Sequence, residues 1–121
     1  MGKLSGKVAL ITGAGTGIGK ATAERMSADG AHVIAGIIGD KERTAASDFT
    51  QRILDVRLQS DWDAALAECH ERFGGIDILV NNAGIIGASG WEEREEANEE
   101  DWDQVYEVNV KGVARVTDAV A

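Results

Sequence analysis

Proline is absent from the 121 residues of this chain, and cysteine occurs once, as Cys69. Without proline, none of the predicted helices carries an interior residue that would break it. A single cysteine excludes an internal disulfide and agrees with a reducing compartment. No apolar run approaches the roughly 20 residues that cross a bilayer, and the first residues lack the apolar stretch of a secretory signal. We therefore expect a cytoplasmic protein that has no membrane partner.

Positive charge is also scarce, because 12 lysines and arginines stand against 21 aspartates and glutamates, which gives a net charge of −9. Residues 92–103 alone hold eight acids and one base, so the rest of the chain is nearly neutral. No basic stripe is left to neutralise the phosphates of a nucleic acid, which excludes that class of partner. We interpret the acidic segment as a solvated loop and helix start, with a partner-docking surface as the alternative.

Short apolar runs without alternation recur along the chain, as strands buried on both faces require. They cover residues 8–11, 33–38, 53–54 (within a strand over 50–54) and 78–80. Segments with helical spacing separate them, and the length suits one domain with a single core. This alternation predicts one α/β domain over residues 1–121, with a parallel sheet and helices on both of its faces.

The expected helices have apolar faces that can be read from their spacing. The first, over 17–28, presents Ile18, Thr22 and Met26, and the next begins at Ser60 as N-cap and ends at Gly74. Cys69 lies on the inner face of the second helix and is interpreted as a small core residue. The last helix begins after Asn98, and its predicted seam consists of Trp102, Val105 or Tyr106, Asn109, Val113, Val116 and Val120. His32 and His70 have no companions at metal-ligand spacing, so no metal site is predicted.

The stretch Thr12–Gly19, T-G-A-G-T-G-I-G, lies between the first predicted strand and the first helix. Its glycines allow a sharp turn and a close approach to a ligand. The free N–H groups of the following helix would face an anion in that turn, such as a pyrophosphate. A purely steric need for glycine in a tight turn is the alternative reading.

Other polar residues follow the later strands, where ligands bind in open parallel sheets. Asp55 follows the third strand and could accept a hydrogen bond from an exocyclic amine, or could be a helix cap. The run N-N-A-G, residues 81–84, follows the fourth strand. Asn109 stands among valines, where its amide needs a partner, so a structural hydrogen bond and a role in a site both remain open.

Taken together, these motifs resemble those of the short-chain dehydrogenase/reductases over essentially the whole chain. The matching elements are T-G-A-G-T-G-I-G, Asp55-Val56, N-N-A-G and the V-N-V around Asn109. The resemblance implies a Rossmann-like parallel sheet of strand order 3-2-1-4. It also implies an NAD- or NADP-dependent oxidoreductase that moves hydride between the nicotinamide and a carbonyl or alcohol substrate.

The resemblance also implies roles for individual residues. Those of the glycine turn would hold the pyrophosphate side of the cofactor, and they are Gly13, Thr16, Ile18 and Gly19. Asp55 and Val56 would contact the adenine, and the inner ribose region would fall to Asn82, Ala83 and Gly84. Asn109 would be the catalytic asparagine, which holds a helix backbone open so that a water can relay protons. The last helix would pack against a second copy in a homo-oligomer.

Two features depart from that pattern. The family places an acid for the adenosine ribose of NAD where Ile37 stands, and no base marks NADP, so NAD is weakly favoured. Family members are about twice as long, and their catalytic serine and Tyr-x-x-x-Lys pair have no counterpart here, because Val110 follows Tyr106 at the lysine position. We therefore expect the cofactor-binding half of such an enzyme, truncated before the later strands and inactive by itself. A non-catalytic dinucleotide-binding or protein-interaction module is the alternative.

Overall fold

Four parallel strands form one sheet in the computed structural model, which describes residues 2–39, 49–83, 96, 98–114 and 117. The strands follow the order β3-β2-β1-β4, as predicted. Their bounds are Val8–Ile11 for β1, His32–Ile37 for β2, Thr50–Ile53 for β3 and Ile78–Val80 for β4. Leu10 of β1 pairs with Ile34 on one side and Leu79 on the other, so β1 lies inside the sheet.

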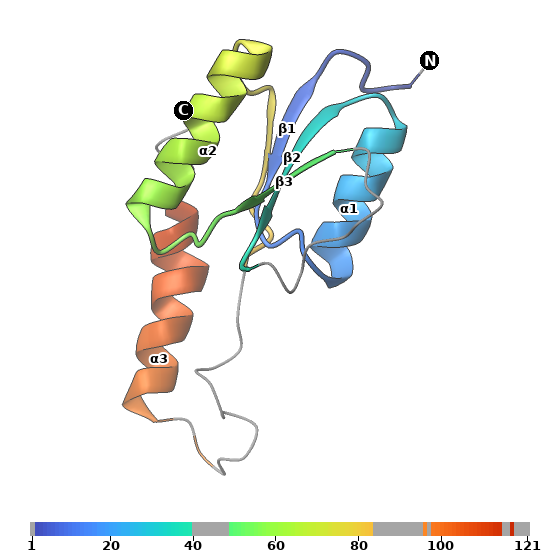
Figure 1. Cartoon of the computed structure of the whole chain (residues 1–121). Helices are drawn as coiled ribbons and strands as arrows, with labels where there is room; N and C mark the ends of the chain where they lie inside the picture. The colour runs from blue at the N-terminus through green and yellow to red at the C-terminus, as the bar shows by residue number, and fades with distance from the viewer. Residues whose placement is uncertain (1, 40–48, 84–95, 97, 115–116, 118–121) are drawn as a thin grey trace.

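Helices cover both faces of this sheet (Figure 1). One face packs against α1, Gly17–Ala28, whose bounds agree with the prediction. The other face carries α2, Gln59–Phe73. Beyond the carboxyl ends of the strands lies α3, Glu99–Tyr106, which continues as the π-helix η3 over Glu107–Gly112, and Val108 of η3 joins the buried cluster of α2. The architecture is therefore the predicted α/β arrangement, in which all four strands point their carboxyl ends toward one edge of the sheet.

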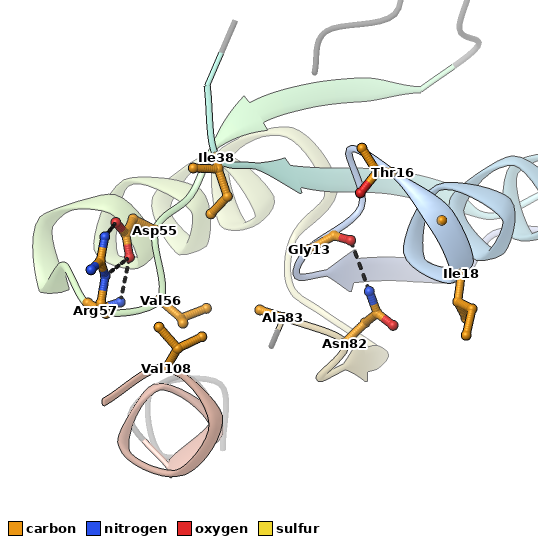
Figure 2. Close-up of a pocket in the computed structure, with 11 residues that line it drawn as sticks. Gly13, Thr16, Ile18, Ile38, Asp55, Val56, Arg57, Asn82, Ala83 and Val108 are labelled. Carbon is orange, nitrogen blue, oxygen red and sulfur yellow. Dashed lines mark hydrogen bonds and ion pairs between the residues drawn. The ribbon is translucent and has the colours of Figure 1, made fainter. Parts of the chain in front are cut away.

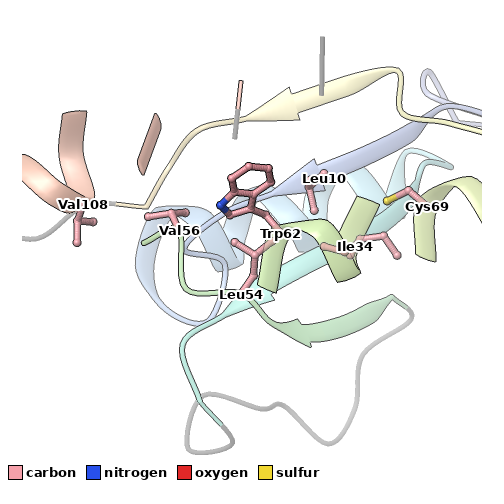
Figure 3. Close-up of a cluster of buried hydrophobic side chains, with 8 residues drawn as sticks. Leu10, Ile34, Leu54, Val56, Trp62, Cys69 and Val108 are labelled. Carbon is pink, nitrogen blue, oxygen red and sulfur yellow. The ribbon is translucent and has the colours of Figure 1, made fainter. Parts of the chain in front are cut away.

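Two clusters of buried side chains hold the layers together. Because successive side chains of a strand point to opposite faces, Leu10 joins the cluster under α2 and Ile11 joins the cluster under α1. Figure 3 shows the first cluster, in which Trp62 of α2 packs beside Leu10. The inner strands are buried almost throughout, but β3 and β4 are mostly half-buried. The expectation of burial on both faces is wrong for these outer strands, since each has a single neighbour in the described sheet.

Small residues bring α1 close to the sheet. Its buried residues are Gly19 and Ala23, and the cluster beneath it contains alanines from β1 and β2. Ile18, which the helical spacing places on the inner face, is instead 80% exposed, and Thr22 and Met26 are half-buried. The predicted face is therefore rotated, because a close approach to the sheet favours residues with little or no side chain.

Burial of the second helix agrees better with the prediction. Trp62, Ala65 and Cys69 are its buried residues, and desolvation of the Cys69 thiol raises its pKa to about 11. This confirms Cys69 as a core residue. Ser60 is not the N-cap, because α2 already begins at Gln59. Gly74 ends the helix as predicted, and the structure shows it in the left-handed conformation at φ +82°.

The last helix begins directly after Asn98, but its predicted seam is wrong. Trp102 is 69% exposed, and Asn109 is exposed as well, whereas Val108 and Gly112 are buried. The i to i+5 hydrogen bonding of η3 widens the turn and shifts the inner face away from the spacing of an α-helix. A Cβ at Gly112 would come 3.0 Å from the Cβ of Val56, so glycine permits this close packing.

Candidate functional site

A cavity of about 630 Å³ lies at the carboxyl ends of the strands (Figure 2). The turn after β1 supplies Gly13, Thr16, Gly17 and Ile18, and Ile38 follows β2. The segment after β3 supplies Asp55, Val56 and Arg57, the segment after β4 supplies Asn82 and Ala83, and η3 supplies Val108. Residues far apart in the sequence therefore meet at the edge where open parallel sheets bind ligands.

The glycine turn opens toward this cavity at the N-terminus of α1. Gly13 and Gly17 have φ values of +61° and +56°, which favour glycine over other residues. Thr16 occupies the N-cap without a side-chain capping bond, and the first turn of α1 carries no acid. The N–H groups and the positive end of the helix dipole are thus available to an anion.

A buried hydroxyl ties that turn to the end of β4. Thr12, which is 1% exposed, accepts hydrogen bonds from the N–H groups of Asn82 at 3.1 Å and Ala83 at 3.0 Å. In return, the Asn82 amide donates to the carbonyl of Gly13 at 2.9 Å. A Cβ at Gly19 would collide with that carbonyl and with the Asn82 side chain. Asn82 is therefore a tether between the two loops.

Opposite the glycine turn, Asp55 forms an ion pair with Arg57. The Nε of Arg57 donates to Asp55 Oδ1 at 3.0 Å, and its Nη2 donates to Oδ2 at 2.7 Å. These side-chain hydrogen bonds hold the pKa of Asp55 below its usual range, although partial burial opposes the shift. The same bonds raise the pKa of Arg57. Asp55 is thus a fixed carboxylate at neutral pH.

Between these polar ends lies an apolar slot. Ile38 lies over this slot and is 55% exposed. Val56 and Val108 are buried and belong to the same hydrophobic cluster. Figure 2 shows these side chains between Asp55 on one side and Gly13 on the other. From one end of the cavity to the other, the site thus offers an anion-binding turn, an apolar slot and a carboxylate. This order suits a ligand with a charged middle and a flat polar end.

The structure brings most of the predicted site residues together and separates others. Those that line the cavity are Gly13, Thr16, Ile18, Asp55, Val56, Asn82 and Ala83. Gly19 is buried behind the turn, and Asn109 lies exposed on η3 outside the lining. Gly84 lies outside the described residues.

The assignment of Ile37 as a ribose-binding position needs correction. Its side chain is 1% exposed within β2, whereas Ile38 lines the cavity. Alternation along the strand explains the difference, because neighbouring side chains point to opposite faces.

Sequence reasoning gave no site role to Thr12, Arg57 or Val108. The signal for Thr12 is a hydroxyl placed directly after an apolar strand, and the signal for Arg57 is a base two residues beyond a predicted site aspartate. Nothing in the sequence marks Val108, since the π-turn decides which way it faces.

Within the described residues, no group of three or more histidine, cysteine, aspartate or glutamate side chains could hold a metal ion. The helices of the described ranges are also too short or too polar to cross a bilayer.

The sheet and its cavity define an α/β protein with a ligand-sized site at the carboxyl ends of its strands. Comparison with known families then identifies it, because the profile described as short chain dehydrogenase matches residues 7–121. The chain belongs to the short-chain dehydrogenase family, whose members use NAD or NADP.

Individual relatives agree with this family membership. Oxidoreductase UcpA of Salmonella typhimurium is 41% identical over 127 residues, covering 99% of this chain and 47% of the relative. A 3beta-hydroxysteroid dehydrogenase of Mediterraneibacter gnavus is 38% identical over 121 residues, covering 91% and 42%. The ligand-free aldohexose dehydrogenase of Thermoplasma acidophilum matches with a TM-score of 0.80 and 30% identity, covering 97% and 44%. The chain thus spans about half the length of the curated relatives it matches.

Removal of the Thr12 hydroxyl tests the tether between the two loops. We expect Thr12→Val to lower the free energy of unfolding by about 1 to 3 kcal/mol, because the Ala83 N–H loses its acceptor and the Asn82 N–H is left with the Val80 carbonyl at 3.2 Å. Urea unfolding measures this change. Thr12→Ser keeps the hydroxyl and should lose much less.

Thr22→Val is the matched control, since the Thr22 hydroxyl donates to the Ile18 carbonyl within α1, in a hydrogen bond at the protein surface. Its effect should stay within about 0.5 kcal/mol, as for most surface substitutions. Equal losses in Thr12→Val and Thr22→Val would contradict the role of the tether.

Proposed function

We propose that this chain binds NAD or NADP in the cavity, as the cofactor-binding half of an oxidoreductase. The observation that carries the proposal is the attachment of the glycine turn to the end of β4 through Thr12 and Asn82. That attachment presents the N-terminus of α1 to the cavity, where a diphosphate is favoured. The family membership of the chain supports the same ligand class.

The residues present fit such a dinucleotide. Gly17 has open space where a side chain would stand, so a phosphate can approach the backbone. The slot formed by Ile38 and Val56 offers apolar surface to a nucleobase, and Asp55 offers an acceptor at its far end. A bound nicotinamide would donate or accept the hydride, while Asn82, Ala83 and Gly84 would flank the inner ribose.

We further propose that the whole enzyme transfers hydride to or from a carbonyl or alcohol substrate. Asn109 would act by holding open the helix backbone, and its position within the π-helix supports this, since i to i+5 turns are frequent at functional sites. The only tyrosine of this chain, Tyr106, is followed by Val110 where a Tyr-x-x-x-Lys pair needs lysine. The 121-residue chain by itself should therefore bind the cofactor without turnover.

Cofactor preference is proposed as NAD over NADP. The side chain at the end of β2 that reaches the cavity is Ile38, which offers no positive charge to an extra phosphate. Thr16 offers none either, and Arg57 already binds Asp55 and Gln104. The relatives are named for substrates as different as a steroid and an aldohexose, so we propose no particular substrate.

A second copy of the chain is the proposed partner of α3. Trp102, Tyr106 and Val110 recur every four residues and are more than half exposed. Such a row of large apolar side chains is typical of a helix that packs against another helix. We therefore propose homo-oligomerisation through this helix.

Titration with NADH tests cofactor binding directly. The chain should bind, and Gly19→Ala should weaken binding at least about tenfold, or about 1.4 kcal/mol, because the new methyl group displaces the turn. Protein fluorescence or calorimetry gives the dissociation constant. Gly39→Ala is the control, since a Cβ there meets open space. Absence of binding to both nicotinamide cofactors by the unsubstituted chain would overturn the proposal.

A carboxylate at residue 38 tests the preference between cofactors. We expect Ile38→Asp to weaken NADP binding relative to NAD by about tenfold, through repulsion of the extra phosphate and bonding to the ribose hydroxyls. Ile37→Asp should instead lower the unfolding temperature, because it buries an unpaired carboxylate. A change of preference in Ile37→Asp alone would reverse this assignment.

Charge on the outer face of α3 tests self-association. Trp102→Glu should weaken the oligomer at least about tenfold, since large aromatic side chains dominate most interfaces. Sedimentation across a concentration series measures the shift. Ala67→Glu, on the exposed side of α2, should leave it unchanged. A monomeric unsubstituted chain at every concentration would exclude the proposal.

A further inference from the structure

The ion pair of Asp55 and Arg57 constrains hydrogen bonding at the Asp55 carboxylate more than a lone carboxylate would be constrained. Asp55 Oδ1 accepts two bonds, one from the backbone N–H and one from the Nε of Arg57, both at 3.0 Å. Its Oδ2 accepts one bond, from Nη2 at 2.7 Å. A carboxylate oxygen has two lone pairs in its plane, so Oδ1 is filled, and among the described residues Oδ2 has a donor in only one of its two directions.

Several contacts hold this pair in one arrangement. The Nη1 of Arg57 donates to Gln104 Oε1 of α3 at 2.8 Å, which anchors the guanidinium on its other side. The backbone N–H of Asp55 donates to the Asp61 carboxylate of α2 at 2.9 Å. Asp55 is therefore fixed through its backbone by one helix, and through Arg57 by another.

We propose that Arg57 sets the nucleobase specificity of the cavity by holding Asp55 as a charged acceptor with one open direction. This inference rests on the proposed dinucleotide binding. Such a carboxylate can only accept a hydrogen bond, so it favours a base that presents an exocyclic amine and disfavours one that presents a carbonyl there. The cavity then selects adenine over hypoxanthine.

The location of the pair supports this assignment. Both residues line the cavity beside Val56 and Ile38, whose apolar side chains suit the face of a planar base (Figure 2). The Arg57 side chain is 39% exposed and that of Asp55 is 16% exposed, so the ion pair lies at the edge of the protein and not in its core. A carbonyl facing the free lone pair of Oδ2 would be repelled and left without a donor, a mismatch that costs about 1 to 3 kcal/mol.

For nucleobase specificity, the two parallel hydrogen bonds from the Arg57 guanidinium to Asp55 should matter more than its positive charge. Arginine binds both carboxylate oxygens in one plane, whereas lysine offers a point charge on a flexible stem. Arg57 acts on the base through Asp55, so it is a positioning residue, and the informative quantity is a ratio of affinities.

The test compares binding of NAD with binding of nicotinamide hypoxanthine dinucleotide, in which a carbonyl replaces the exocyclic amine. The unsubstituted chain should prefer NAD by about tenfold or more, equal to about 1.4 kcal/mol. Arg57→Gln should reduce that preference to less than about threefold, and Arg57→Lys should not restore it. Asp55→Asn should also abolish the preference, because an amide can donate as well as accept.

The matched control is Arg52→Gln, which breaks another arginine–carboxylate pair, with Glu68, outside the cavity. Its preference for NAD should equal that of the unsubstituted chain. Nicotinamide mononucleotide, which lacks the adenosine half, should bind all variants alike. Thermal unfolding confirms that each variant is folded.

Other results separate this inference from the proposed function. If Arg57→Gln weakens both dinucleotides equally, or strengthens NAD binding, the inference is overturned while cofactor binding stands. Full recovery of the preference for NAD in Arg57→Lys would likewise overturn the role of the two parallel hydrogen bonds. If the unsubstituted chain binds neither dinucleotide, the proposed function itself is wrong.

Discussion

The hydrogen bonds of one buried hydroxyl, that of Thr12, determine how the whole site is assembled. Thr12 directly follows β1 and accepts hydrogen bonds from the N–H groups of Asn82 and Ala83 beyond β4, so it joins segments about 70 residues apart in the sequence. Asn82 completes the connection through the Gly13 carbonyl. Because buried N–H groups need acceptors, these hydrogen bonds fix the position of the glycine turn relative to the segment after β4. The glycine turn, the N-terminus of α1 and the wall of the cavity all take their positions from it.

Close packing between backbones is the second constraint on the site. The layer under α1 consists mainly of alanines and small aliphatic residues, and Gly19 lies where any side chain would strike the Gly13 carbonyl. On the other face, Gly112 lets η3 approach Val56. Small residues therefore bring a helix to each side of the cavity, and larger side chains are left outside. The exposure of Ile18 and Trp102 follows from the same geometry.

Electrostatics distinguishes the two ends of the cavity. The end at α1 presents the first N–H groups of the helix with no capping bond from the Thr16 side chain and no acid in the first turn, whereas the end beyond β3 presents the carboxylate of Asp55. In a chain of net charge −9, the guanidinium of Arg57 keeps that carboxylate both ionised and fixed. The cavity thus has opposite polarity at its two ends, with apolar surface between them, and this orders a ligand along its length.

The sequence by itself determined the alternation of strands and helices, because apolar runs, helical spacing and glycine turns are local features of the chain. It fixed the bounds of β1, α1 and β4, the end of α2 at Gly74 and most residues of the cavity. The tertiary structure alone decided which neighbour of a pair faces the cavity, as with Ile37 and Ile38, and which face of the last helix is buried. It also decided that Arg57 binds Asp55. These outcomes depend on where β2 ends, on a π-turn and on contacts between distant segments, and none of the three can be read from the local periodicity of the chain.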